Sequence, residues 1–183
     1  MDRAAKIVPL VSAALMAVGL YYILKKPKQT NNTSNIDMDN EGKKIPRGYR
    51  NNNPCNIRKV PGAAIWQGEV LPNTDGSFVQ FKSKPYGYRA AFQTIRTYKN
   101  KYGIDTVSAI ISRYAPNNEN NTAGYINRVC SITGFIPGTV INPYNKEQMS
   151  KLIYAMAIVE NTNDWGYNPI PDVSEIEEGW RLL

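Results

Sequence analysis

The sequence contains no histidine and only two cysteines among its 183 residues. Without histidine there can be no Ser-His-Asp triad, no Cys-His nucleophile pair and no zinc site with histidine ligands. Two cysteines are also too few for a zinc site made of four thiolates. No metal site and no cofactor are expected for this chain. The groups left for proton transfer near neutral pH are chiefly carboxylates, with tyrosine and lysine second. If the protein is an enzyme, its composition favours a carboxylate enzyme.

Basic residues outnumber acidic residues by 22 to 15, and the formal net charge is +7. The positive charges are scattered along the chain rather than gathered into a basic run, so no specific nucleic-acid partner is expected. A mildly cationic surface suits an anionic polymer such as the bacterial cell wall, or anionic lipid headgroups. Cys55 and Cys130 can form one disulfide or stay free, and they do not fix the redox compartment.

Residues 7–24 (IVPLVSAALMAVGLYYIL) form an apolar run without a charged residue. As a helix the run would extend about 27 Å, close to the hydrocarbon thickness of a bilayer. Tyr21 and Tyr22 lie where an interfacial aromatic pair is expected, and lysines follow directly. A cleaved signal peptide is the competing interpretation, but no small-x-small cleavage site follows the run. Residues 1–24 are therefore predicted to be a single transmembrane anchor, and basic residues on both sides leave its orientation open.

Three further segments follow the predicted anchor. Residues 25–46 hold few apolar residues and many Asn, Lys and Asp, a composition that cannot bury a core. They are predicted to be a flexible linker. A globular domain is predicted at residues 47–168 and a C-terminal tail at residues 169–183. The sequence leaves open whether this acidic tail, which contains Trp180, packs on the domain or contacts a partner.

Apolar residues recur at helical spacing inside the domain and predict four amphipathic helices. The expected helices begin at Pro85, at Val107, at the cap Thr122 and after Asn145, and their apolar positions continue to Tyr102, Tyr114, Val129 and Val159. Gly103 and Gly134 follow the first and third as C-terminal stops, and Thr122 is expected to cap the third. Asn145 with Gln148 resembles a capping box before the fourth.

The segment from Trp66 to Phe81 has a shorter, turn-punctuated pattern. Asp75-Gly76 in its middle predicts a hairpin turn. The predicted fold class is therefore mainly α (α+β), with a small β-hairpin.

Glu160 is the carboxylate that the helical pattern singles out. Met149, Ile153 and Met156 precede it on one helical face, so the acid continues an apolar face. Burial there raises a carboxyl pKa, and the negative end of the helix dipole acts in the same direction. A carboxyl group that stays protonated suits the general acid of glycosidic cleavage. The alternative is a last-turn glutamate that points to solvent or pairs with a lysine.

Residues 50–58 (RNNNPCNIR) are rich in side-chain amides, which suit the hydroxyl and N-acetyl groups of sugars because they donate and accept hydrogen bonds. Asn also favours Asx-turns and left-handed backbone, so a purely structural turn is an equal alternative. Trp66 and Tyr114 are candidates for stacking on sugar rings, although single aromatics more often belong to the core or its rim. Cys55 is not expected to be a nucleophile, because no histidine can activate it.

The runs RGYRNNNPCNIR, WQGE, DGSFVQF, RYAPNNENNTAGYINRV and AIVEN resemble a family of phage proteins. Its members are described as virion or structural proteins and in part as lysozyme-like lytic enzymes. They usually read RNNNPGNIR near the start and end in a helix that closes on a Glu-Asn pair. The resemblance covers about residues 47–161, and Cys55 stands where the family usually has Gly.

A second resemblance is to enzymes that cut glycan strands. NPCNIR, WQG and DGSFVQF follow one another as similar segments do in autolysin-type glucosaminidases, whose catalytic Glu segment comes before them. Here the similar segment, AMAIVENTNDWG, comes at the other end. The run RYAPNNENNTAGYINRV is also similar to a region of lytic transglycosylases. Together these resemblances imply a circularly permuted lysozyme-like fold with Glu160 beside the Asn-rich turn.

The resemblance implies a membrane-anchored, peptidoglycan-degrading lytic enzyme of a phage virion, with Glu160 as its catalytic residue. It carries Asn53 and Asn56 over as substrate-binding or site-shaping residues. Tyr114 and Tyr125, with Trp66, are expected in the substrate groove. A lytic transglycosylase needs no second carboxylate, whereas a hydrolase does. The candidates for that second carboxylate are Glu69, Asp75, Glu119 and Asp164.

The expected partners are peptidoglycan glycan strands, a lipid membrane and capsid proteins. The expected location is the membrane of a membrane-containing virion or the host cell membrane. The alternative function is that of a non-catalytic virion structural protein, which would link the capsid to an internal membrane through the same anchor and linker.

Overall fold

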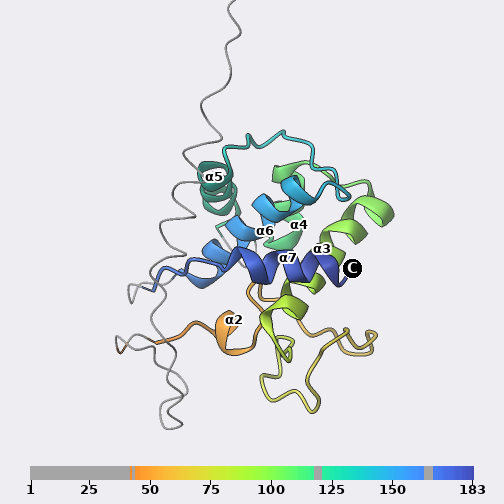
Figure 1. The fold of residues 1–183 in the computed structure, drawn as a ribbon. Helices are drawn as coiled ribbons and strands as arrows, with labels where there is room; N and C mark the ends of the chain where they lie inside the picture. The colour runs from red at the N-terminus through yellow and green to blue at the C-terminus, as the bar shows by residue number, and fades with distance from the viewer. Residues whose placement is uncertain (1–41, 43, 118–120, 163–166) are drawn as a thin grey trace, which may run out of the picture. The chain divides into compact units, whose positions relative to one another are not determined.

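The computed structural model describes residue 42 and residues 44–117, 121–162 and 167–183. Within these ranges the chain is mainly helical and contains no strand (Figure 1). The helices are α2 (Arg47–Arg50), α3 (Lys84–Tyr102), α4 (Val107–Tyr114), α5 (Thr122–Thr133), α6 (Lys146–Asn161) and α7 (Val173–Arg181). The predicted anchor at residues 1–24 lies outside the described residues, and so does most of the predicted linker. None of the described helices has the length and apolar character to cross a membrane.

The four helices predicted from apolar spacing are confirmed as α3, α4, α5 and α6. Gly103 and Gly134 end α3 and α5 in left-handed conformations, with φ of 68° and 75°. The prediction that Thr122 caps α5 is wrong. Asn121 is the N-cap, because its side-chain oxygen accepts the Gly124 amide, and Thr122 is the first helical residue.

The predicted capping box of α6 is only half formed. Asn145 accepts the backbone N–H of Gln148 at 3.0 Å, as a capping residue does. The side-chain oxygen of Gln148 accepts the Asn142 amide at 2.8 Å instead of turning back to Asn145. Gln148 therefore holds the loop that precedes the helix.

The predicted β-hairpin does not form strands in the described part of the chain. Val70 donates to the Gln80 carbonyl at 2.8 Å, and Lys82 donates to the Gly68 carbonyl at 2.9 Å, but the pairing is limited to isolated antiparallel bridges. Side-chain oxygens of Asn73, Asp75 and Gln80 accept backbone N–H groups at the turn. Such local bonds compete with a strand ladder, so the segment is a side-chain-capped loop.

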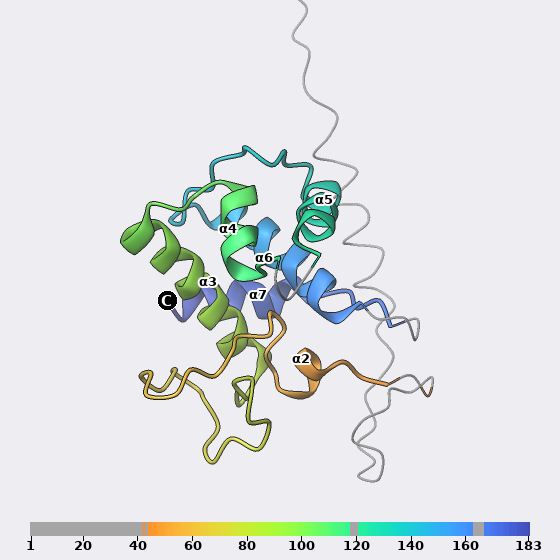
Figure 2. The same cartoon turned by 180° about the vertical axis from the view of Figure 1, so that it is seen from behind.

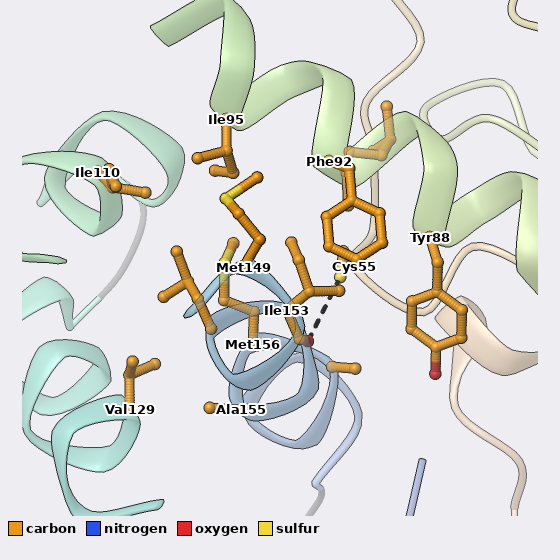
Figure 3. Close-up of a cluster of buried hydrophobic side chains, with 14 of the residues drawn as sticks. Cys55, Tyr88, Phe92, Ile95, Ile110, Val129, Met149, Ile153, Ala155 and Met156 are labelled. Atoms are coloured by element: carbon orange, nitrogen blue, oxygen red, sulfur yellow. Dashed lines mark hydrogen bonds between the residues drawn. The ribbon is translucent and has the colours of Figure 1, made fainter. Parts of the chain in front are cut away.

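Helix α6 supplies the centre of the apolar core. It contacts α2, α3, α5 and α7, and Figure 3 shows its buried side chains surrounded by those of the neighbouring helices. Met149, Ile153 and Met156 of α6 are fully buried. The largest α3 side chains in the same cluster are Tyr88, Phe92 and Ile95. The face of α6 that precedes Glu160 is therefore buried, as its spacing predicts.

The C-terminal tail, whose position the sequence leaves open, packs on α3 through α7 (Figure 1, Figure 2). The Trp180 ring meets the Phe92 ring edge-on at 5.2 Å between centroids. Arg89 Nε donates to the Leu182 carbonyl at 2.9 Å. Gly179 permits this close approach, because a Cβ there would lie 2.7 Å from Tyr88 Cβ.

Candidate active site

The Asn-rich turn, residues 51–57, is stabilised by its own side-chain amides. Asn52 and Asn56 each have φ of 50°, a left-handed conformation that Asn tolerates better than most residues. Asn53 is fully buried, and its amide donates to the Ile57 carbonyl at 2.9 Å and the Val79 carbonyl at 2.8 Å. Its oxygen accepts the Ile57 amide at 2.8 Å. Asn53 therefore shapes the turn, and the prediction that it contacts substrate does not fit its burial.

The end of α6 is joined to this turn by Asn161. This side chain is buried and donates to the Pro54 carbonyl at 2.7 Å and to the Ala157 carbonyl at 2.8 Å. Gly48 of α2 lies directly against it, since a Cβ on Gly48 would be 2.4 Å from Asn161 Oδ1. Helix α2 and the Asn-rich turn, although distant from α6 in the sequence, are thus closely packed around its last turn.

The carboxylate of Glu160 is held from two sides. Asn56 Nδ2 donates to Oε2 at 2.9 Å, and the Tyr125 hydroxyl donates to Oε1 at 2.9 Å. Burial raises the pKa of Glu160 above its ordinary value, although the hydrogen bonds from Asn56 and Tyr125 and the charge of Arg58 act in the opposite direction. The alternative expectation, a glutamate that points to solvent or pairs with a lysine, is not what the structure contains.

A cleft of about 460 Å³ lies beside Glu160. Three of the residues predicted to bind substrate are on its walls, namely Asn56, Trp66 and Tyr114. The described lining residues include one acid, Glu160, and two bases, Arg58 and Arg113. Polar groups and aromatic rings are thus combined in one concave site, which is typical of ligand-binding clefts.

Tyr125 has a different place from the one expected. It is buried, with 8% of its surface exposed, and its hydroxyl is directed at Glu160. Tyr125 is therefore a residue that positions the carboxylate and does not line the cleft. Tyr114 does line the cleft, and its hydroxyl donates to the Cys55 carbonyl, which fixes the ring against the Asn-rich turn.

Two of the four candidate second carboxylates are used for local structure. Glu69 accepts the Trp66 amide at 3.0 Å and lies 3.7 Å from Lys59 Nζ. Partial burial acts to raise the pKa of Asp75, but hydrogen bonds from Asn51 and from turn amides hold that pKa below its usual range. Neither residue lines the cleft. The other two candidates, Glu119 and Asp164, lie outside the described residues.

Both cysteines are free thiols. Cys55 is fully buried against α6, with Sγ 4.0 Å from the Ile153 carbonyl (Figure 3). Burial, together with the charge of Glu160, raises the pKa of the Cys55 thiol well above its ordinary value. A buried, protonated thiol is a poor nucleophile, so Cys55 acts as a small core residue.

The cleft wall also holds two arginines, Arg58 and Arg113, that the sequence pattern does not predict as functional residues. Arg58 is the last residue of the RNNNPCNIR run and Arg113 directly precedes Tyr114, so both are next to predicted site residues. An exposed arginine has no periodic or capping signal of its own, and only the packing of α4 near the turn brings these two to one cleft.

By fold and site, this is a mainly helical domain in which a buried glutamate at a helix end faces a cleft beside an Asn-rich turn. No family model matches the chain. It is 41% identical to protein P5 of Pseudoalteromonas phage PM2 over 136 residues, which cover 74% of this chain and 80% of that protein. The chain belongs to the family of phage PM2 protein P5.

Proposed function

We propose that the protein is a virion-associated phage enzyme that degrades peptidoglycan, with Glu160 as general acid and base in cleavage of the glycan strand. Its relationship to a phage protein supports the phage part of this proposal. The observation that carries the chemistry is the Glu160 carboxylate, which lies on a cleft wall and is held at 2.9 Å by both Asn56 and Tyr125.

The surroundings of Glu160 suit a group that must give up a proton and take one back. Burial favours the protonated acid before reaction. Transfer of the proton to the glycosidic oxygen leaves a carboxylate, and Asn56 and Tyr125 already donate to its two oxygens. These donors need no rearrangement to stabilise the new charge. The carboxylate then removes a proton from the attacking hydroxyl in the second half of the reaction.

The charges of the described cleft wall favour a lytic transglycosylase over a hydrolase. In a transglycosylase the substrate's own hydroxyl attacks and an anhydro sugar forms, so one carboxylate suffices. Glu160 is the one acid among the described lining residues. A hydrolase would need Glu119 or Asp164 as a second carboxylate, because Glu69 and Asp75 are engaged elsewhere. Mass spectrometry of the released sugars separates the two reactions, since an anhydro product weighs one water less than a hydrolysis product.

The contact between Asn56 and Glu160, residues far apart in the chain, also supports a circularly permuted lysozyme-like fold. In the related enzymes the Glu segment precedes the turn, and here it follows. We propose further that residues 1–24 anchor the domain in the virion membrane or the host cell membrane. Retention of the protein in the lipid fraction after alkaline extraction of virions tests this anchor.

The central experiment is zymography of the full chain on purified cell wall, with the E160Q variant beside it. The wild type should clear the wall, and E160Q should lose activity by about a hundredfold or more, as removal of a general acid does. E147Q is the matched control, because it makes the same change on an exposed residue of α6. Equal clearing by E160Q, or an inert wild type, would overturn the enzymatic proposal and favour a structural protein that links capsid and membrane.

A further inference from the structure

Asn56 and Asn161 connect the Asn-rich turn to the last turn of α6 in both directions. The Asn161 amide donates to the Pro54 carbonyl of the turn at 2.7 Å. The Asn56 amide donates back to the Glu160 main-chain carbonyl at 3.3 Å and to the Glu160 carboxylate at 2.9 Å. Each asparagine therefore bonds a main-chain carbonyl of the segment that holds the other. Because Asn161 directly follows Glu160 in the chain, its bond to the turn sets how far Glu160 lies from Asn56.

The side-chain oxygens of the same two asparagines show which way their amides face. Both Oδ1 atoms are buried, and within the described part of the chain neither accepts a hydrogen bond. Both lie against Gly48, since a Cβ there would be 2.4 Å from Asn161 Oδ1 and 2.9 Å from Asn56 Oδ1. A Cα–H group makes only weak contacts with such oxygens. Gly48 thus leaves room for both oxygens, and the nitrogens of both amides are turned toward the carbonyl groups that they bond.

Backbone strain at Asn56 makes support from outside the turn necessary. Its φ of 50° is left-handed, a conformation that costs free energy in a residue with a Cβ and persists only where the surroundings hold it. Two side chains from helices hold the residues just before it. Asn161 of α6 donates to the Pro54 carbonyl, and Tyr114 of α4 donates to the Cys55 carbonyl. Of the two, Asn161 belongs to the same helical turn as the carboxylate that Asn56 contacts.

We propose that Asn161 is a positioning residue that acts on Glu160 through Asn56: it holds the Asn-rich turn at the end of α6, so that the Asn56 amide meets the carboxylate. The inference rests on the proposed function, in that Glu160 is taken as the acid. Asn161 is 1% exposed and does not line the cleft, so it does not itself contact a ligand there. Its effect passes through the ionisation of Glu160, because a carboxylate that loses a donor binds a proton more tightly.

The experiment is an NMR titration of the full-length protein with isotope-labelled glutamate side chains, in which the signal absent from E160Q identifies Glu160. N161A should raise the pKa of Glu160 by about one, and N56A by about one to two, as loss of a hydrogen bond to a charged group does. In the double variant N56A/N161A the pKa should match that of N56A alone, because the effect of Asn161 requires Asn56. The other titratable groups that act on Glu160 stay in place in all these variants, namely Tyr125, Arg58, Cys55 and Tyr114.

Two further variants separate positioning from a general loss of stability. N161S keeps a hydroxyl that can bond the Ala157 carbonyl of its own helix but is too short to replace the bond to Pro54. It should raise the pKa of Glu160 as N161A does and retain more of the stability. I95V is the matched control, because Ile95 is a buried core residue of α3 that does not hold the turn; it should lower the free energy of unfolding and leave the pKa of Glu160 unchanged. An unchanged pKa in N161A and N161S, an equal rise in I95V, or a double variant whose pKa exceeds that of N56A overturns the positioning role.

The outcomes also distinguish this inference from the enzymatic proposal, because the titration needs no substrate. If the pKa of Glu160 rises in N161A but the wild type clears no cell wall, the positioning of the carboxylate holds and the catalytic proposal fails. If the wild type clears cell wall but the pKa of Glu160 is the same in N161A, catalysis holds and the positioning role fails. If both hold, the alkaline limb of the pH–rate profile of N161A should move to higher pH, as expected for an acid that stays protonated longer.

Discussion

Replacing Tyr125 with Phe tests the role of Glu160 most directly, because it removes one hydrogen-bond donor and keeps the ring. The Tyr125 hydroxyl lies 2.9 Å from Glu160 Oε1, and only 8% of the residue is exposed, so solvent does not screen the bond. A hydrogen bond to a charged group contributes about 1.5–3 kcal/mol, which corresponds to about a ten- to hundredfold change in an equilibrium. Y125F should therefore disfavour the ionised form of Glu160 by that factor.

The sign of the effect on activity follows from the role of Glu160 as an acid. The hydroxyl stabilises the carboxylate, so its loss raises the pKa of Glu160 further, and the protonated form persists to higher pH. The alkaline limb of kcat/KM should move to higher pH in Y125F. The maximal rate should fall, because the carboxylate formed by proton transfer has lost a donor.

The assay is the initial rate of turbidity loss of a cell-wall suspension, measured across pH for both proteins. Y144F is the control, since the exposed Tyr144 hydroxyl bonds to Asn100 and does not line the cleft. Its profile should overlay that of the wild type. An alkaline limb in Y125F that stays in place, or moves to lower pH, would refute the assignment of Glu160 as the acid.

Three further predictions concern the same region. Burial raises the pKa of Glu160 in the folded state, so the stability that Glu160 contributes is present at acid pH and is lost as pH rises through that pKa. The free energy of unfolding measured in urea should therefore fall less between acid and neutral pH in E160Q than in the wild type. N56D replaces a donor with a second carboxylate beside Glu160, so the alkaline limb of its pH–rate profile should move to higher pH, and an unshifted limb would contradict the contact. G48A places a Cβ 2.4 Å from Asn161 Oδ1 and should lower the free energy of unfolding by about 1–3 kcal/mol. In contrast, G138A, where a Cβ meets nothing within 4 Å, should leave thermal unfolding nearly unchanged.

The helices are the part of the fold that local sequence determines well. Apolar spacing defines α3 to α6, and Gly103 and Gly134 end two of them because glycine adopts the left-handed conformation without strain. The predicted hairpin fails for an equally local reason. Asn, Asp and Gln side chains near the turn accept backbone N–H groups and leave only isolated bridges. The pattern of turn residues indicates that the chain reverses direction, but it does not indicate whether the two flanking segments pair as strands.

The candidate site, like the fold, is predictable from the sequence only in part. The i, i+4 spacing of α6 is sufficient to predict that Glu160 ends a buried face. The two groups that hold its carboxylate are not predictable from spacing, because Asn56 is 104 positions away and Tyr125 is 35 positions away. Tyr125, which is predicted to line the groove, is instead buried and donates to Glu160. A helical pattern indicates which residues are buried but not which buried hydroxyl contacts which acid.

The Asn-rich turn shows most clearly that the sequence does not predict where individual side chains lie. Asn53 and Asn56 are chemically identical and three positions apart, yet one is fully buried and the other is on the cleft wall. Asn56 has a left-handed backbone, and a run of amides in the sequence does not reveal which of its positions adopts that conformation. By itself the sequence determines the absence of histidine chemistry, the helices and the position of Glu160 on its helix. The partners of the carboxylate, the arginines of the cleft and the docking of α7 on α3 depend on tertiary structure, because contacts between distant segments leave no local period in the chain.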